Sequence, residues 1–282
     1  MTSSVDWLEV ELTAPADQES SLALLLERRH LGGWVVEPET EGLRWVFYVP
    51  QEPGWKERLG ALGLAAAEHD GVIKVRGQVR DEDWAENWKE FYHPRRLTRR
   101  LVLRPSWAEF QAEPGDLVIE LDPGMAFGTG YHASTRLCLE LLEEQPPAER
   151  VLDMGTGSGI LSIAALLMGS QRVTAIDCDP VAVRVARENL RHNRLSKRAR
   201  VLLGENVPRA RYDLILANLI AQVLVEMAPE LTRALAPGGR LVVGGIIDTR
   251  VDEVLEAFSG LVAVGRGEEE GWVALAFQRP CG

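Results

Sequence analysis

The sequence contains no long apolar run and no leader-like start. Its apolar stretches fall well short of the roughly 18 consecutive residues that a membrane-spanning helix needs. The first ten residues, MTSSVDWLEV, hold neither the basic stretch nor the apolar stretch of a secretory signal. We therefore expect a cytoplasmic protein that does not enter a membrane.

Cysteine is scarce and negative charge is in excess. Cys138, Cys178 and Cys281 are odd in number and far apart, which matches neither a disulfide framework nor a metal-ligand spacing. This usage favours a reducing compartment and no metal site. Lysine and arginine number 31 against 42 acidic residues, a formal net charge of −11. An acidic chain repels a phosphate backbone, so we expect no direct nucleic-acid binding, and a basic protein or an amine is the better partner.

The first pattern in the chain covers residues 1–79, where we expect a strand, a helix, two strands, a helix and a strand. Apolar side chains alternate along WLEVEL (7–12) and LRWVFYVP (43–50), as in half-buried strands. Residues 55–67 favour a helix. This order is typical of a small ferredoxin-like α+β domain, a fold that by itself says nothing about the ligand.

A helical linker is expected at residues 80–94. Asp81 to Phe91 is rich in strong helix formers, and Pro94 ends the segment. Trp84 and Trp88 lie four apart on one face, where packing against a neighbouring domain is the favoured interpretation.

The second pattern covers residues 95–282. Short apolar runs such as RVLDM, RVTAID, DLILAN and RLVVGG alternate with helical stretches. They predict an α/β domain with a doubly wound, Rossmann-like, mainly parallel sheet. The tail LVAVGRGEEEGWVALAFQ reads as two further strands, one of them antiparallel, which would complete a seven-stranded sheet.

A glycine-rich turn follows the strand RVLDM. Gly155, Gly157 and Gly159 let the backbone turn sharply and approach a ligand at the start of a helix. Asp177 ends the next strand, where a carboxylate can accept both hydroxyl hydrogens of a ribose. The third glycine of a dinucleotide motif is absent because position 160 is isoleucine, and no Gly-Lys-Ser/Thr of a phosphate loop is present.

These residues resemble a known family. VLDMGTGSG with AIDCDP looks like motif I and its acidic partner in seven-stranded S-adenosylmethionine-dependent methyltransferases. The stretches DPGMAFGTGYHASTRLCLELL, ANLIAQVL and LAPGGRLVVGGI are more specific. They resemble the ribosomal-protein methyltransferases of the PrmA type, which modify large-subunit ribosomal protein eleven. The resemblance is strong over residues 80–282 and rests on architecture alone before them.

The resemblance implies a set of site residues. Motif I and its partner would bind S-adenosylmethionine through Asp153, Gly155, Thr156, Gly157, Asp177 and Cys178. The segment before motif I would close over the cofactor, with Thr135 at its methionine part and Phe127, Gly128 and Thr129 as the wall of the transfer site. Such a wall excludes water and helps to desolvate the attacking amine. His132 is a candidate helper, with a hydrogen-bonded core histidine as the favoured alternative.

Asn218 is the remaining candidate, for the cofactor and for catalysis. It follows the strand DLILA at the carboxyl edge of the sheet, where doubly wound folds bind ligands. Enzymes that methylate planar amides or bases usually carry Asn-Pro-Pro-Tyr here, whereas this chain has Asn-Leu-Ile-Ala. The difference favours an aliphatic amine as acceptor. A helix N-cap is the structural alternative for Asn218.

The predicted reaction is methyl transfer to lysine side chains of the ribosomal protein, with its N-terminal amine as an alternative acceptor. Another protein substrate for the same fold stays open, and a nicotinamide-dependent oxidoreductase is a weaker alternative.

Two charged features have ordinary interpretations. The stripe of Arg184, Arg187, Arg191 and Arg194 is typical of a solvated helix face, with ribosomal RNA as the alternative partner. The acidic stretch GEEEGW is typical of a solvated turn, with a lysine-rich substrate as the alternative partner.

Overall fold

The computed structural model describes residues 7–18, 22, 25–26, 34–39, 42–51, 54–79, 92–122, 128, 130 and 132–281. The chain divides into two compact units. The smaller unit holds the described residues up to His93. The larger unit holds Pro94–Asp122 and the described residues from Gly128 onward. Of the expected linker at 80–94, only residues 92–94 are described and they are not helical; Trp84 and Trp88 lie outside the described residues.

The smaller unit has a four-stranded antiparallel sheet in the order β2-β3-β1-β4. Its strands are β1 (Trp7–Ala14), β2 (Trp34–Glu39), β3 (Gly42–Pro50) and β4 (Val72–Val79), and α2 spans Trp55–Ala67. A 3-10 turn, η1 (Ala16–Gln18), follows β1, and Leu22, Leu25 and Leu26 are helical. The predicted ferredoxin-like order is confirmed, and its core includes the fully buried Trp45 and Phe47.

One polar residue of β1 is buried against expectation. Glu11 alternates with the core residues, yet it is only 4% exposed. Arg76 donates two hydrogen bonds of 2.8 Å to its carboxylate, and Arg44 lies 3.5 Å away. The second face of this strand is therefore covered by charged side chains rather than by solvent.

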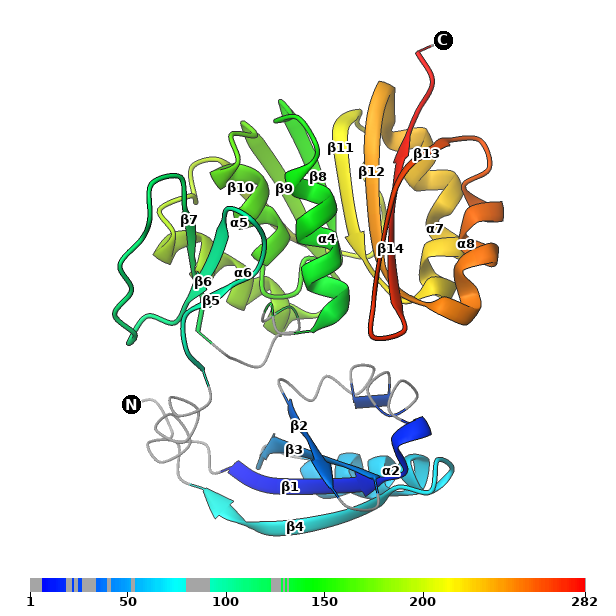
Figure 1. Ribbon diagram of the computed structural model, residues 1–282. Coiled ribbons are helices and arrows are strands. Elements are labelled where there is room, and N and C mark those ends of the chain that lie inside the picture. The colour runs from blue at the N-terminus through cyan, green and yellow to red at the C-terminus, as the bar shows by residue number, and fades with distance from the viewer. Residues whose placement is uncertain are drawn as a thin grey trace. The chain divides into compact units, whose positions relative to one another are not determined.

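The larger unit contains the predicted seven-stranded sheet, in the order β10-β9-β8-β11-β12-β14-β13 (Figure 1). Its strands are β8 (Arg150–Met154), β9 (Arg172–Asp177), β10 (Ala199–Leu203), β11 (Tyr212–Asn218), β12 (Leu235–Ile247), β13 (Val262–Glu269) and β14 (Trp272–Gln278). The strands from β8 to β12 are parallel. The two strands predicted from the tail are present, and the antiparallel one is β14, as expected; its insertion between β12 and β13 was not predicted.

Helices cover both faces of this sheet. The helices are α4 (Ala133–Glu143), α5 (Ile160–Leu167), α6 (Pro180–His192), α7 (Ala221–Ala234) and α8 (Val251–Ala257), and a 3-10 turn, η2 (Asp248–Arg250), precedes α8. One apolar cluster joins the sheet to α4, α5 and α6, and a second joins it to α7 and α8 (Figure 1). The doubly wound arrangement brings the carboxyl ends of the parallel strands to one edge.

A third, small sheet was not predicted from the sequence. It consists of β5 (Arg95–Arg96), β6 (Leu101–Arg104) and β7 (Leu117–Glu120), in that order. The strands are short, and Leu101, Val102 and Leu103 are buried in succession, so the alternation that marks a half-buried strand is missing. No helix in the described part of the chain is long and apolar enough to cross a membrane.

Candidate functional site

The glycine-rich turn joins β8 to α5 and is held against the end of β9. Gly155 and Thr156 donate backbone hydrogen bonds of 2.9 and 3.0 Å to the carbonyl oxygen of Ile176. Gly155 has a φ of +71°, and a β-carbon there would lie 2.3 Å from Leu219 Cδ2. Glycine at this position therefore lets the backbone adopt a left-handed conformation and lets the Leu219 side chain pack directly against it.

Asp153 supports this turn from inside. It is fully buried, and its Oδ2 accepts hydrogen bonds of 2.6 Å from both Thr156 Oγ1 and Ser162 Oγ. Burial raises the pKa of Asp153 to about 6, and the two hydroxyl bonds act against that rise. The carboxylate thus fixes the position of Thr156 within the turn.

Asp177 stands at the carboxyl end of β9, beside the turn. Its Oδ2 accepts from Gly157 N at 2.8 Å, and its Oδ1 accepts from Asp179 N at 3.0 Å. The next residue, Cys178, is exposed. Burial and the charge of Asp177 raise the pKa of the Cys178 thiol, which keeps it protonated and makes it a poor nucleophile.

The sequence contains Gly-Thr-Gly twice, at 128–130 and at 155–157, and a hydrogen bond links the first stretch to the residue that follows the second. Ser158 Oγ, directly after the second stretch, donates a hydrogen bond of 2.6 Å to the carbonyl oxygen of Gly128 in the first. Gly128 has a φ of +91°, and a β-carbon there would lie 3.0 Å from the same Ser158 Oγ. Of the other wall candidates, Phe127 and Thr129 lie outside the described residues.

His132 is the N-cap of α4. Its Nδ1 accepts a hydrogen bond from Ser134 N at 3.3 Å and lies 2.8 Å from Ser134 Oγ. The ring meets Trp272 edge-on, with 4.7 Å between centroids. Burial, with a smaller contribution from Arg136, lowers the pKa of His132 to about 4, so the ring is neutral near pH 7.

Asn218 ends β11 and reaches across to α4. Its Nδ2 donates to Thr135 Oγ1 at 3.3 Å and to Ser134 Oγ at 3.4 Å. The alternative role of Asn218 as a helix N-cap is wrong, because Ile220 occupies that position of α7. The structure therefore brings Asn218, Thr135 and the N-terminus of α4 together at the carboxyl edge. Thr135 itself is fully buried.

Comparison with known proteins identifies the family. The sequence model described as Ribosomal protein L11 methyltransferase (PrmA) matches residues 47–280. A ribosomal protein L11 methyltransferase of Chloroflexus aurantiacus is 40% identical over 98% of this chain and 99% of its own length. One from Geobacter metallireducens is 48% identical over 82% of this chain and 80% of its own length. The chain belongs to the PrmA family of ribosomal protein L11 methyltransferases.

A solved structure agrees with this membership. The ribosomal protein L11 methylase of Lactobacillus delbrueckii subsp. bulgaricus superimposes with a TM-score of 0.59 at 29% identity. The match covers 67% of this chain and 99% of that one. The PrmA family is a family of S-adenosylmethionine-dependent protein methyltransferases, and the chain is such an enzyme. The glycine turn and the Asp177 carboxylate at the sheet edge fit that cofactor.

Several neighbours of the candidate site residues were missed from the sequence. Ser134 bonds Asn218, and Ser158 bonds Gly128. No sequence pattern distinguishes these two serines from others in the chain. Gly244 and Gly245 lie against Asn218, where β-carbons would come 3.2 Å from its Oδ1. The paired glycines at the end of an apolar strand run were the one available signal for this close approach.

The turn between β13 and β14 also borders α4. Arg136, which is 8% exposed, pairs with Glu269 at 2.7 Å and lies 3.7 Å from Glu270. Together with the His132–Trp272 contact, this ion pair fixes the acidic turn beside the first turn of α4. Glu269 thus ties the acidic turn to α4, while Glu268 and Glu270 are exposed, as expected for a solvated turn.

The titration of His132 predicts a pH effect on stability. The unfolded chain protonates this ring near pH 6.5 and the folded chain near 4, so the unfolded state binds more protons between these values. Stability should then fall as the pH decreases through that range. His132→Asn keeps a good N-cap and removes the titration. Between pH 7.5 and 5, the wild type should lose about 2 kcal/mol more free energy of unfolding than this variant.

Urea unfolding of both chains at the two pH values measures this difference. Asp153, with its raised pKa, has the opposite effect: its contribution to stability is lost as the pH rises through about 6. Because Asp153 is present in both chains, its effect cancels in the comparison. Equal losses in the two chains would show that His132 is not held neutral.

Proposed function

We propose that the chain transfers methyl groups from S-adenosylmethionine to amines of ribosomal protein L11. The acceptors are lysine side chains, with the N-terminal amine as an alternative. The observation that carries the proposal is the meeting of Asn218 and α4 at the carboxyl edge, beside the glycine turn and Asp177. From the end of β11 the chain reads Asn-Leu-Ile-Ala, without the proline and aromatic that enclose a planar acceptor, which supports an aliphatic amine.

In this proposal the cofactor lies along the carboxyl edge. Asp177 accepts the ribose hydroxyls, with Cys178 as a packing neighbour. Gly155, Thr156 and Gly157 line the cofactor, and Asp153 holds their turn in place. The methionine part lies toward Asn218 and Thr135. The segment at Phe127, Gly128 and Thr129 forms the wall that excludes water.

When bound, S-adenosylmethionine supplies a methyl group activated by its positive sulfonium, so the protein forms no covalent intermediate. The task of the protein is to hold a neutral amine in line at roughly 3 Å. Desolvation lowers the pKa of a lysine amine, so solvent can take its proton and no residue is required as the base. Asn218 orients the amine or the methionine end. His132 assists by fixing the start of α4, because its neutral Nδ1 is already a hydrogen-bond acceptor.

The smaller unit is proposed to recognise the protein substrate. It has its own core, and the residues proposed for the cofactor and the transfer site belong to residues 127–218 of the chain. We also assign the enzyme to the cytoplasm. The exposed free thiols of Cys178 and Cys281 are consistent with a reducing compartment.

Mass spectrometry of purified L11 after incubation with the enzyme and S-adenosylmethionine tests the proposal. Each transferred methyl should appear as a fixed mass increase on L11, and peptide mapping should place it on amines. A chain that starts at Pro94 should still bind the cofactor but lose most of its activity on intact L11, because it lacks the substrate-recognition unit. Undiminished activity of the shorter chain would remove that role. Methylation of a different ribosomal protein, with L11 unmodified, would favour the alternative substrate.

Asp177→Ala should weaken S-adenosylmethionine binding by about 1.5–3 kcal/mol, the scale of a hydrogen bond to a charged group. The fold should persist because the carboxylate lies at the edge of the sheet. Isothermal titration calorimetry measures the affinity, and Asp179→Ala is the matched control because the Asp179 side chain caps α6 and its backbone bond to Asp177 survives the substitution. Unchanged affinity in folded Asp177→Ala would refute the assignment of this residue.

A further inference from the structure

A hollow of about 550 Å³ in the larger unit is lined almost entirely by arginine. Arg150 begins β8, and Arg233 stands in the last turn of α7. The remaining lining residues, Arg209, Ala210 and Arg211, come just before β11. Because β8 and β11 are parallel, the hollow lies at their amino ends, the edge opposite Asn218. Such a concentration of positive charge is unexpected in a chain of net charge −11.

The four guanidinium groups are not neutralised by carboxylates. All four arginines are exposed, and within the described ranges no ion pair joins any of them to an acidic residue. The adjacent Asp213 accepts the backbone N–H of Arg150 at 2.9 Å. Like charges gathered around one hollow repel each other, so an anion bound between them would lower the electrostatic energy.

Two of the arginines are held in place by contacts of their own. Arg211 Nη1 donates to the carbonyl oxygen of Leu235 at 3.1 Å, and the guanidinium carbon of Arg150 lies 5.5 Å from the ring centroid of Tyr212. Restrained side chains lose less conformational freedom when they bind. Arg211 and Arg233 also lie at the C-terminal end of α7, where positive charge stabilises the helix. That structural role does not account for Arg150 or Arg209.

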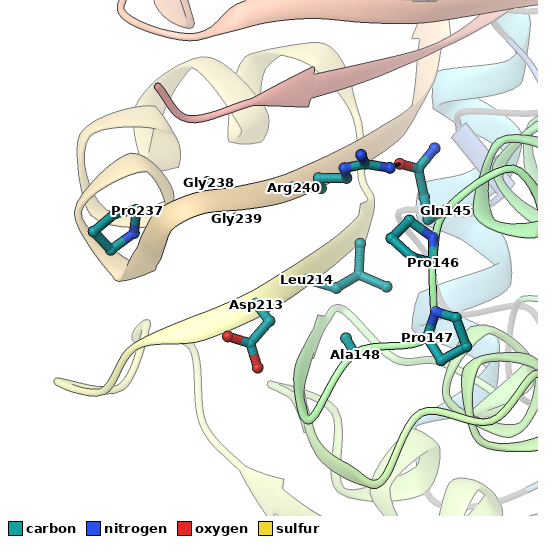
Figure 2. A pocket seen from close by; sticks show the side chains of 10 residues that line it. All are labelled: Gln145, Pro146, Pro147, Ala148, Asp213, Leu214, Pro237, Gly238, Gly239 and Arg240. Atoms are coloured by element: carbon teal, nitrogen blue, oxygen red, sulfur yellow. Dashed lines mark hydrogen bonds between the residues drawn. The ribbon is translucent and has the colours of Figure 1, made fainter. Parts of the chain in front are cut away.

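The surroundings extend the positive charge along one direction. Arg172, also exposed, begins β9 directly opposite Arg150 in the strand register. A separate, smaller hollow of about 170 Å³ is lined by Asp213 and Arg240 among others (Figure 2). There Arg240 donates to Gln145 Oε1 at 3.0 Å, as the dashed line in Figure 2 shows. The exposed arginines at the amino edge therefore include Arg172 in addition to the four that line the hollow.

We infer that this arginine hollow binds consecutive phosphate groups of an RNA backbone. The planar fork of arginine matches a phosphate with two parallel hydrogen bonds. Four charges in the hollow, with Arg172 beyond it, exceed what a single phosphate needs. Among the described residues that line the hollow, Ala210 is the only apolar one, and the nearby Tyr212 is 3% exposed, so neither provides a surface for stacking a base. Recognition would thus rest on the backbone and be independent of sequence.

The inference concerns a second site and does not depend on the methyl-transfer proposal. It departs from the expectation that an acidic chain avoids nucleic acid, because the local field at a charged concavity can differ in sign from the net charge. The carboxyl edge holds Asp177 and Glu269, whereas the arginine hollow lies at the amino edge. RNA held there would leave the proposed acceptor site open.

Fluorescence anisotropy with a labelled oligouridine of about 20 nucleotides tests the inference. The variant Arg209→Gln/Arg233→Gln removes two charges and leaves the Arg211–Leu235 bond and the Arg150–Tyr212 contact in place. The control Arg184→Gln/Arg191→Gln removes two charges from the exposed face of α6. We expect the full-length wild type to bind in a salt-dependent manner. The hollow variant should bind about tenfold more weakly. Its plot of log affinity against log salt concentration should be less steep by about 1.4, because each of the two lost phosphate contacts contributes about 0.7 to the slope for a single strand.

The control variant should bind within about twofold of the wild type, as expected for charges outside the contact. Methylation of isolated L11 should be the same in all three chains, which separates this site from the transfer site. Absence of RNA binding by the wild type at low salt, or an equal loss in both variants, would overturn the inference. So would preferential binding of polyglutamate, which would indicate an acidic protein partner. Thermal stabilisation by inorganic phosphate without RNA binding would indicate a small-anion site instead.

Discussion

Asn218→Ala is expected to lower the rate of methyl transfer by about 100-fold or more while the chain stays folded. The Asn218 amide spans the gap from β11 to α4, where it bonds Thr135 Oγ1 and Ser134 Oγ. Its loss frees the end of α4 that borders the proposed acceptor site. A displacement of about 1 Å between reacting groups is enough for a loss of this size. Single-turnover methylation of L11 at saturating cofactor measures the rate of the chemical step.

The matched control is Asn193→Ala in the same unit. Asn193 also bridges two elements, since its side chain bonds the backbone N–H and carbonyl of Glu120 in β7. That contact belongs to the small third sheet and involves neither α4 nor β11. The control should therefore lose stability and keep its single-turnover rate. Equal rate losses in the two variants would mean that Asn218 acts only through general stability.

Gly245→Ala is expected to lower both stability and activity. Gly245 has a φ of +76°, and a β-carbon there would lie 2.6 Å from the carbonyl oxygen of Leu219 and 3.2 Å from Asn218 Oδ1. The conformational strain and the clash with the backbone together should reduce the free energy of unfolding by about 2–4 kcal/mol. Turnover should fall at least about tenfold, because relief of the clash moves Leu219 and Asn218 at the site.

Gly260→Ala is the control for this substitution. A β-carbon at Gly260 meets no atom within 4 Å, and no positive φ is required there. Alanine at such a position leaves stability unchanged or raises it by up to about 1 kcal/mol. Urea unfolding and methylation rates of both variants complete the comparison. If Gly245→Ala resembles Gly260→Ala, the close approach at the end of β12 does not constrain the site.

The sequence predicted the parts of the fold that have a repeating pattern. The apolar runs of β8, β9 and β11 identify a parallel sheet because both faces are buried by helices. The alternation along β1 and β3 similarly identifies a sheet with one face on the core. The small sheet within residues 95–120 was not predicted, because its three short strands show neither a long apolar run nor a clear alternation.

Those parts of the candidate site that depend on backbone shape could be predicted from the sequence. The parts that depend on contacts between distant side chains could not. The turn at Gly155 and the carboxylate of Asp177 follow from glycine spacing and strand order. The bond from Ser158 to Gly128 joins residues 30 positions apart, and the bond from Asn218 to Thr135 joins residues 83 apart. No local pattern contains such long-range pairs, so they needed the three-dimensional structure.

The insertion of β14 between β12 and β13 has a consequence for biosynthesis. Residues 272–278 are synthesised after both β12 and β13, yet they lie between these two strands in the sheet. Until they arrive, β12 remains an unpaired edge and β13 has no neighbour in the sheet. The helix α4, which carries Thr135, packs on all three of these strands. A growing chain therefore cannot assemble the proposed transfer site before β14 is made, so chains that terminate before β14 would be inactive as well as incompletely folded.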